Sequence, residues 1–356
     1  MGKKGSGKKV FVGLSGGVDS AVSAVLLQKK GYDVTGVFIR IAIPGYPCTA
    51  GEDKVDAQRV AAHLRIPFIE IDLSKEYEKE VFRSSIEAFK NGTTPNPDTL
   101  CNQKIKFGAF FDFALSQGAE YVATGHYARI ESDGEDIELL SGIDSDKDQS
   151  YFLWMVPEKA LRQALFPVGH LHKPQVRALA NQFGLPNARR KDSQGLCFLG
   201  DISIEDMLQR ELQLHAGEVL DEHGAVVGQH KGAARYTLGQ RHGFDLTVQT
   251  GEPHFVVDKD QLANTITVST SPFPRDASKT HLTLTDTNWI GTVVDGTYTA
   301  RYRYRQRLVT AELIKNNGTA QVVLWEPHYV PLGQSLVFYD GERCLGGGII
   351  SDTHLS

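Results

Sequence analysis

The chain of 356 residues carries a formal net charge of −5 and is 41% hydrophobic, a composition typical of a folded globular protein. This charge argues against a surface that binds any nucleic acid indiscriminately, and no apolar stretch reaches the length of about 18 residues that spans a bilayer. The length exceeds what one compact core usually holds, so we expect two or three domains, a cytoplasmic location and no membrane contact. Residues 1–9 contain four lysines among glycines and are expected to form a basic flexible tail.

Strands and helices alternate over the first third of the chain. Strands are predicted at 10–12, 33–41, 68–72 and 121–123, and helices at 21–30 (ending at Gly31), 52–64, a long stretch ending near Gly92, and 104–116. This order predicts an α/β domain with a doubly wound parallel sheet. Its ligand crevice should lie at the carboxyl ends of the strands.

A glycine-rich loop follows the first strand. It consists of Gly13, Leu14, Ser15, Gly16, Gly17, Val18, Asp19 and Ser20. Glycines let several amide N–H groups converge on one oxyanion, and the start of a helix adds free donors. Asp19 beside a phosphate makes sense if a Mg²⁺ ion bridges the carboxylate and the phosphate oxygens. The alternative is an ordinary glycine turn.

The stretch from Thr93 to Asn102 contains two prolines, Pro95 and Pro97. Because proline lacks an N–H group and restricts the residue before it, we expect a stiff loop that presents Asp98 and Cys101. A helix predicted from residue 104 onward places Cys101 near a helix N-terminus, which favours the thiolate.

Further polar stretches follow the strand at 121–123. Gly125 and His126 occupy a strand-to-turn junction, although a lone histidine is more often a structural residue. Lys147, Asp148 and Gln149 form a second polar stretch. Cys197 comes shortly after Arg189-Arg190-Lys191, a run that either is a solvated face or lowers the pKa of the thiol for an anionic partner. The four cysteines, at positions 48, 101, 197 and 344, show neither CxxC nor zinc-site spacing, so no disulfide scaffold is expected.

Beyond a helix at 203–214 the chain is predicted to be all-β, in two small units with a boundary near 271–274. In a strand, the arginines of the run Arg301 to Arg307 would share one face and the tyrosines the other. That face is either solvated or follows the phosphates of an RNA.

Two resemblances account for these motifs. The loop Gly13–Ser20 resembles the pyrophosphate loop of the N-type ATP pyrophosphatases. The ordered set of motifs resembles the bacterial tRNA-specific 2-thiouridylases over nearly the whole chain: the loop, Asn96-Pro97-Asp98 with Cys101, Gly125-His126-Tyr127, 147–150, 192–197, 303–306 and 344–350.

The second resemblance implies three domains: a pyrophosphatase-type α/β domain at 10–202, a β-rich central domain at 203–274 and a C-terminal β-barrel at 275–356. It implies that ATP adenylates the C2 oxygen of a tRNA wobble uridine and that a cysteine persulfide supplies the sulfur. ATP would bind Gly13 to Ser20, Ile39 and Gly125. Cys101, Cys197 and Asp98 would be catalytic. The target base or tRNA would meet Asn96, Pro97, Asp98, His126, Lys147, Asp148, Gln149, Arg303, Tyr304 and Gln334. The resemblance also implies an anticodon stem-loop and a cysteine desulfurase or relay protein as partners, and we expect a monomer. Ile39 stands where many relatives have Met.

Two other functions remain open at this stage. An amide-forming ligase could be built on the same domain, but it would need neither two loop cysteines nor a basic strand. A non-catalytic tRNA-binding protein would not need the glycine loop with Asp19.

Overall fold

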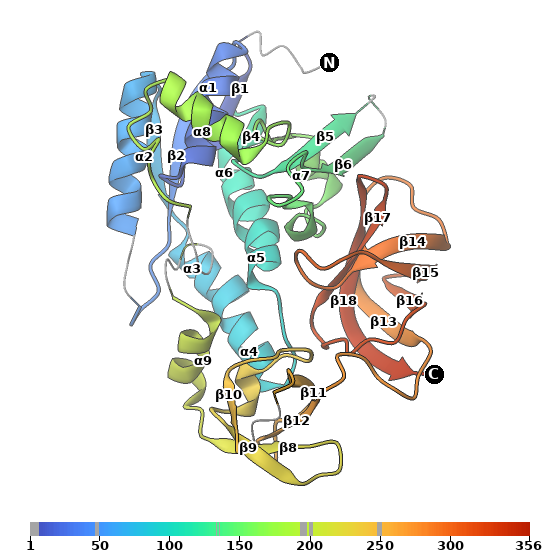
Figure 1. The fold of residues 1–356 in the computed structure, drawn as a ribbon. Coiled ribbons are helices and arrows are strands. Elements are labelled where there is room, and N and C mark those ends of the chain that lie inside the picture. Colours follow the sequence, from blue (N-terminus) through green and yellow to red (C-terminus); the bar gives the residue numbers. More distant parts are fainter. Residues whose placement is uncertain are drawn as a thin grey trace.

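The computed structural model describes residues 7–46, 50–132, 134, 136–192, 198, 202–247 and 251–356. Figure 1 shows an α/β layer with two β-rich parts beside and below it. None of the helices in these ranges is long and apolar enough to cross a membrane.

The first sheet is parallel and has the strand order β3-β2-β1-β4-β7, which confirms the predicted fold class. Its strands are β1 (Lys9–Gly13), β2 (Asp33–Arg40), β3 (Phe68–Asp72), β4 (Tyr121–Ala123) and β7 (Ala164–Leu165). Side chains alternate across the sheet, so Val10 and Val12 pack on one face and Phe11 on the other. Each face therefore has its own apolar core.

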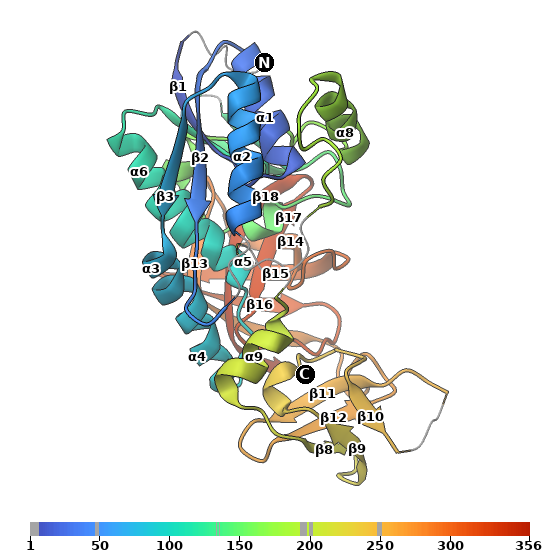
Figure 2. The ribbon, with the colours of Figure 1, turned by 90° about the vertical axis from the view of Figure 1, so that its left-hand side faces the viewer.

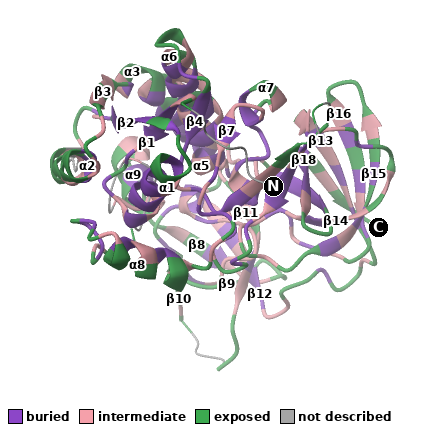
Figure 3. Cartoon of the chain, turned by 90° about the horizontal axis from the view of Figure 1, so that it is seen from above, coloured by how far each residue is buried: buried purple, intermediate pink, exposed green. Residues whose placement is uncertain are grey.

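Helices cover both faces of this sheet. α1 (Val18–Lys29) and α2 (Ala50–Leu64) pack on one face, with α8 (Lys173–Gln182) against α1, and α6 (Phe110–Ser116) packs on the other face. The apolar core of that second face continues into α3 (Ser74–Tyr77), α4 (Ser84–Lys90) and α5 (Pro97–Leu100). Figure 3 shows buried residues between these layers, whereas the outer sides of α2 and α8 are exposed. Gly31 ends α1 with φ at 82°, as predicted for a helix C-cap.

The third and fourth predicted helices, the stretch that ends near Gly92 and the helix at 104–116, differ from the sequence prediction. A π-helical segment, Glu78–Arg83, joins α3 to α4, and another, Cys101–Ala109, joins α5 to α6. The expected loop at 93–102 is therefore wrong from Pro97 onward. Proline at the first helical position loses no hydrogen bond, and the Asn96 side chain caps the helix by accepting a bond from the Thr99 amide at 3.2 Å.

A central β unit follows α9 (Ile204–Leu212) and lies apart from the first sheet (Figure 2). Its strands are β8 (Gly217–Leu220), β9 (Val226–His230), β10 (Phe244–Leu246), β11 (Phe255–Asp260) and β12 (Thr265–Ser269), in the order β10-β9-β8-β12-β11. Val219, Val256 and Ile266 form the centre of its small core.

The last β unit is a barrel, because β13 pairs with both β16 and β18 and so closes the sheet. Its strands are β13 (Thr280–Trp289), β14 (Gly296–Arg301), β15 (Val309–Asn316), β16 (Thr319–Leu324), β17 (Ser335–Asp340) and β18 (Arg343–Leu355). A hairpin of the α/β domain, β5 (Ala128–Ser132) and β6 (Ile137–Ser141), pairs with β18 and extends this sheet. The hairpin fixes the barrel beside the α/β layer.

Short helical elements complete the described chain. They are the 3₁₀ turns Ser150–Phe152 and Ala233–Arg235 and the helix α7 (Glu158–Leu161).

Candidate active site

A cavity of about 420 Å³ opens at the carboxyl ends of the parallel strands. Thirteen of the predicted site residues line it: Gly13, Leu14, Ser15, Gly17, Val18, Asp19, Ser20, Ile39, Gly125, His126, Lys147, Gln149 and Tyr304. The topology thus places residues from the first and last thirds of the chain around one space. Val37, Phe38, Ile39 and Phe110 give it an apolar wall.

The backbone of the glycine loop is held in place from outside. Gly16 has φ at +78°, and a Cβ there would lie 2.6 Å from the carbonyl oxygen of Asp53, so both conformation and space require glycine. The buried side chain of Asn187 donates from Nδ2 to the carbonyl oxygens of Gly16 at 2.7 Å and Gly17 at 3.0 Å. Because C=O and N–H point in opposite directions in a trans peptide, fixing these carbonyls also fixes the amide N–H groups on the other side. Sequence reasoning missed Asn187, since nothing around it resembles a motif.

Asp19, in the first turn of α1, belongs to an ion network at the cavity wall. Lys173 Nζ lies 2.8 and 2.9 Å from the two Asp19 carboxylate oxygens, and the Tyr127 hydroxyl donates to Oδ1 at 2.8 Å. Lys173 Nζ also lies 2.8 Å from Asp192. Burial raises the pKa of Tyr127 well above its usual value, so its hydroxyl remains a donor. The sequence analysis missed Lys173, although it occupies the first position of a helix beside the crevice.

Asp192 is the most strongly paired carboxylate of the network. Burial by itself would raise its pKa, but hydrogen bonds from Lys173 and Lys147 outweigh that effect and lower the pKa to about 2. Arg177 adds a third cation at 2.5 Å. Asp192 is therefore ionised over the whole physiological range.

A metal ion at this site would depend on the nucleotide. Among the described residues, no group of three or more His, Cys, Asp or Glu side chains could hold a metal by itself. Asp19 does present a carboxylate to the cavity, with its side chain 30% exposed. One carboxylate combined with phosphate oxygens and water is a usual Mg²⁺ environment, so Asp19 fits the magnesium ion that we expect together with ATP.

The junction after β4 packs directly against the start of α1. A Cβ on Gly125 would lie 2.7 Å from the Ser20 amide nitrogen, which is why the position needs glycine. His126 is buried, with Nδ1 2.7 Å from Thr124 Oγ1 and Nε2 3.4 Å from Lys106 Nζ. Burial, followed by the charge of Lys106, lowers the pKa of His126 well below its usual value. The ring is neutral, and since Lys106 can only donate, Nε2 accepts and Nδ1 carries the proton.

The segment from Asn96 to Cys101 lies away from the cavity lining. Cys101 is 0% exposed and packs in the core with Ile105 and Tyr151, so the expectation that a loop presents this thiol is wrong for this conformation. Asp98 is partly exposed in the first turn of α5. Gln334, from the barrel, donates to the Thr94 carbonyl at 2.9 Å and so joins this segment to the barrel.

Asp148 supports the cavity without lining it. It is 5% exposed, and Oδ1 accepts from the amides of Gly142 and Ser150 at 3.0 and 3.1 Å. Oδ2 accepts from Arg301 at 2.8 Å. In this conformation the carboxylate is engaged inside the protein, and the expected contact of Asp148 with tRNA stays a prediction. Its neighbour Gln149 accepts from the Tyr127 amide at 3.0 Å and does line the cavity.

The arginine run is not a strand face, because β14 ends at Arg301 and a turn follows. Arg301 pairs with Asp148, Arg303 donates to the Leu238 carbonyl of the central unit, and Arg305 donates to the Asp146 carbonyl at 2.7 Å. The arginines of this run thus connect the barrel to the α/β domain and to the central unit. Only Tyr304 and Arg305 of this run line the cavity.

The cysteines divide by what the structure describes. Cys197 and Cys48 lie outside the described residues. The described cysteines, Cys101 and Cys344, are both buried, and burial raises the pKa of the Cys344 thiol to about 12. Cys344 therefore behaves as a structural thiol of the barrel.

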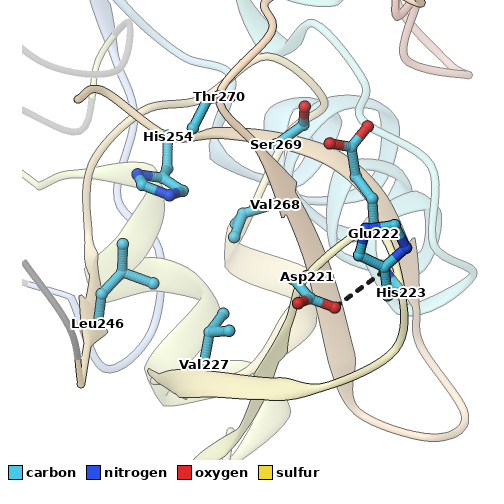
Figure 4. Close-up of a pocket in the computed structure, with 9 residues that line it drawn as sticks. All are labelled: Asp221, Glu222, His223, Val227, Leu246, His254, Val268, Ser269 and Thr270. Atoms are coloured by element: carbon cyan, nitrogen blue, oxygen red, sulfur yellow. Dashed lines mark hydrogen bonds between the residues drawn. The ribbon is translucent and has the colours of Figure 1, made fainter. Parts of the chain in front are cut away.

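A second, smaller cavity of about 160 Å³ lies in the central unit (Figure 4). Asp221 and His254 border it together with apolar side chains such as Leu246. The Asp221 carboxylate accepts from the amides of His223 and Ala225, both at 2.9 Å, and so serves the local turn. Nothing here matches the motifs of the sequence analysis.

Family models match three consecutive parts of the chain. They are the tRNA methyl transferase HUP domain at residues 8–201, the tRNA methyl transferase PRC-barrel domain at 205–270 and the aminomethyltransferase beta-barrel domain at 279–350. The HUP-domain match contains the whole parallel sheet and the large cavity apart from Tyr304 and Arg305.

Curated relatives match over nearly the full length. The tRNA-specific 2-thiouridylase MnmA of Bacillus subtilis (strain 168) is 41% identical, with 99% of this chain and 98% of that protein covered. MnmA of Listeria welshimeri is 43% identical (98% and 96% covered), and MnmA 1 of Geobacillus kaustophilus (strain HTA426) is 44% identical (97% and 96% covered). At this identity and coverage, the chain belongs to the tRNA-specific 2-thiouridylase family.

Proposed function

We propose that this protein is an ATP-dependent tRNA-uridine 2-sulfurtransferase that acts on the wobble uridine of the anticodon loop. The observation that carries the proposal is the cavity in which the glycine loop, Asp19 and a group of cations meet at the end of the parallel sheet. Five cationic side chains line this cavity against three carboxylates, although the whole chain has a net charge of −5. This local excess of positive charge suits a polyanion such as ATP.

ATP would lie with its phosphates on the loop Gly13–Ser20 and its adenine against the apolar wall that includes Ile39. Loop amides and the start of α1 would bind phosphate oxygens. Asp19 would hold Mg²⁺ together with those oxygens. When bound, the ion would neutralise charge on the phosphate chain.

The proposed reaction has two halves. In the first, the C2 oxygen of the uridine bonds to the α-phosphorus, the α–β bridging bond breaks with its electron pair on pyrophosphate, and the N3 proton passes to water. In the second, the Cys101 thiolate attacks the Cys197 persulfide, forming a disulfide and releasing sulfide. Sulfide bonds to C2 and AMP leaves with the C2–O electron pair. A cytoplasmic thiol reductant then reopens the disulfide with two electrons.

Burial of Cys101 adds a requirement to this scheme. With the Cys101 thiol 0% exposed in the helical segment that follows α5, a nucleotide base cannot reach it in this conformation. In this scheme the Asn96–Cys101 segment would rearrange when tRNA binds. The π-helical segment Cys101–Ala109 directly follows it, and π-helical turns are frequent at functional sites.

The tRNA would approach across the side where the cavity and the barrel meet. His126, Lys147, Gln149, Arg303, Tyr304 and Gln334 would contact it, and Asn96, Pro97 and Asp98 would meet the target base. An anticodon-loop uridine is already unpaired, so turning it into a pocket costs little. We further propose a cytoplasmic monomer that receives sulfur from a cysteine desulfurase or relay protein, with domains at 10–202, 203–274 and 275–356.

Mass spectrometry of tRNA nucleosides would test the proposal. Purified protein is incubated with ATP, Mg²⁺, cysteine, a cysteine desulfurase and unmodified tRNA, and the expected product is 2-thiouridine. Omission of ATP is the control. If no 2-thiouridine forms while ATP is still cleaved, the class of reaction is wrong. ATP-dependent pyrophosphate release onto a small metabolite without tRNA would favour the amide-forming ligase.

Single cysteine variants would test the sulfur path. Cys101→Ser and Cys197→Ser should each abolish 2-thiouridine while ATP still binds, and only Cys197→Ser should fail to accept labelled sulfur from the desulfurase. Cys48→Ser is the matched control. A Cys197→Ser protein that thiolates tRNA at the parent rate would contradict the persulfide scheme.

A further inference from the structure

Lys173 is a cavity-lining cation whose position is fixed by its own backbone. It is the first residue of α8, and its amide donates to Asp144 Oδ2 at 2.8 Å. The preceding turn is closed by a capping box between His172 and Gln175. The helix start therefore does not shift easily, whereas the four-carbon side chain can.

The ammonium group of Lys173 sits between two carboxylates from distant parts of the chain. It contacts Asp19 of the glycine loop at 2.8 Å and Asp192 at 2.8 Å, and lies 5.8 Å from the centre of the Tyr127 ring. The side chain is only 13% exposed, yet it lines the cavity. A mostly buried cation thus lies at the start of α1, beside the glycine loop.

Structural pairing by itself does not explain this arrangement. Asp192 already has Lys147 at 2.9 Å and Arg177 at 2.5 Å, and Asp19 has the Tyr127 hydroxyl. Buried ion pairs are inefficient stabilisers, because desolvation offsets much of the attraction. A lysine has three donors and carries a compact charge, so the same ammonium group can bind phosphate oxygens once a nucleotide enters.

We propose that Lys173 is a catalytic residue of adenylation, whose ammonium group turns from Asp19 and Asp192 to the phosphate chain of ATP and stabilises the departing pyrophosphate. This inference rests on the proposed function. When the bond between the α-phosphorus and the bridging oxygen breaks, the electron pair stays on pyrophosphate, and the ammonium group beside it lowers the energy of that charge. Movement of Lys173 also frees the Asp19 carboxylate for Mg²⁺.

Two measurements on Lys173→Met and Lys173→Arg would test the proposal. The first is calorimetric binding of the α,β-methylene analogue of ATP with Mg²⁺, which reports contact with phosphate without any reaction. The second is the rate of tRNA-dependent pyrophosphate release. Lys29→Met is the matched control, because Lys29 lies at the other end of α1 with its Nζ 4.9 Å from the centre of the Phe183 ring.

We expect Lys173→Met to bind the analogue about tenfold more weakly and to release pyrophosphate about a hundredfold more slowly. Lys173→Arg should recover part of the binding, and Lys29→Met should match the parent protein in both measurements. If Lys173→Met binds the analogue and releases pyrophosphate as the parent does, Lys173 is a structural counter-ion and the proposal is wrong.

Two further outcomes separate this proposal from its neighbours. If Lys173→Met unfolds, the double variant Lys173→Met/Asp192→Asn removes one charge of each sign and is measured in its place. If the parent makes no 2-thiouridine but Lys173→Met still loses analogue binding, the proposed function fails and the phosphate contact of Lys173 stands.

Discussion

The glycine loop and the arginine run both concentrate one kind of residue within a few positions, but the fold uses them in opposite ways. All residues of Gly13–Ser20 except Gly16 line the same cavity. Arg301, Arg303 and Arg305 diverge to Asp148, Leu238 and Asp146. The loop acts mainly through its backbone, whose turn follows from its glycines and is then held by Asn187, whereas each arginine acts through a long side chain whose partner depends on the tertiary fold.

The largest expected effect is on the loop side of this comparison. Asp19→Asn keeps the shape of the side chain but removes the charge that would hold Mg²⁺, so pyrophosphate release should fall about a thousandfold. Thermal unfolding should change little, because Tyr127 can still donate to the amide oxygen and Lys173 keeps Asp192 as its partner. Asp33→Asn, at the exposed start of β2, is the control. Pyrophosphate release at the parent rate would remove Asp19 from the mechanism.

The next effect tests the connection that the arginine run makes through Arg301. Arg301→Met should lower the free energy of unfolding by about 3 kcal/mol, because it leaves Asp148 charged and buried without its cation. The side chains of the pair are 13% and 6% exposed. Urea unfolding would measure the change, with the exposed Arg307→Met as control. The double variant Arg301→Met/Asp148→Asn should regain part of the lost stability. Equal stability of Arg301→Met and the parent would show that the Arg301–Asp148 pair does not stabilise the protein.

A smaller effect, on nucleotide affinity, is expected at Asn187. It tests whether phosphate binding depends on the orientation of the loop backbone. Asn187→Ala releases the carbonyls of Gly16 and Gly17, so the affinity for the α,β-methylene analogue should fall about tenfold, or about 1.4 kcal/mol. Asn181→Ala, on the exposed side of α8, should leave affinity unchanged. Calorimetric titration distinguishes the two, and unchanged binding in Asn187→Ala would mean that the loop holds its shape unaided.

The smallest effect concerns salt. If the run were a continuous phosphate-binding face, replacing Arg301, Arg303 and Arg305 by Gln would lower the salt slope of tRNA binding by about three units. Because Arg301 is committed to Asp148, we expect the triple variant to lose no more slope than Arg303→Gln/Arg305→Gln, which is less than about two units. Filter binding across a salt series measures this. A further decrease in the salt slope caused by Arg301→Gln would instead indicate that all three arginines bind phosphates of the tRNA.

The parallel sheet, the glycine loop and the position of the crevice could all be predicted from the amino-acid sequence. These features depend on neighbours within a few residues: alternation in β1, the left-handed Gly16, and the start of α1. Motif order also indicated the family over the whole chain. Such features can be predicted from sequence because each depends on the backbone conformation of only a few neighbouring residues.

Which distant side chains come into contact could not be predicted from the sequence. Lys173 and Asn187 reach the loop across more than 150 positions, Cys101 is enclosed by the core of the α/β layer, and the β5–β6 hairpin extends the barrel sheet. Pro97 misled the sequence prediction because proline is unfavourable inside a helix yet well suited to its first position, and that prediction places Asn96-Pro97, which caps and starts α5, in a loop. Contacts between distant segments follow from how the layers pack, and that packing depends on the whole core at once.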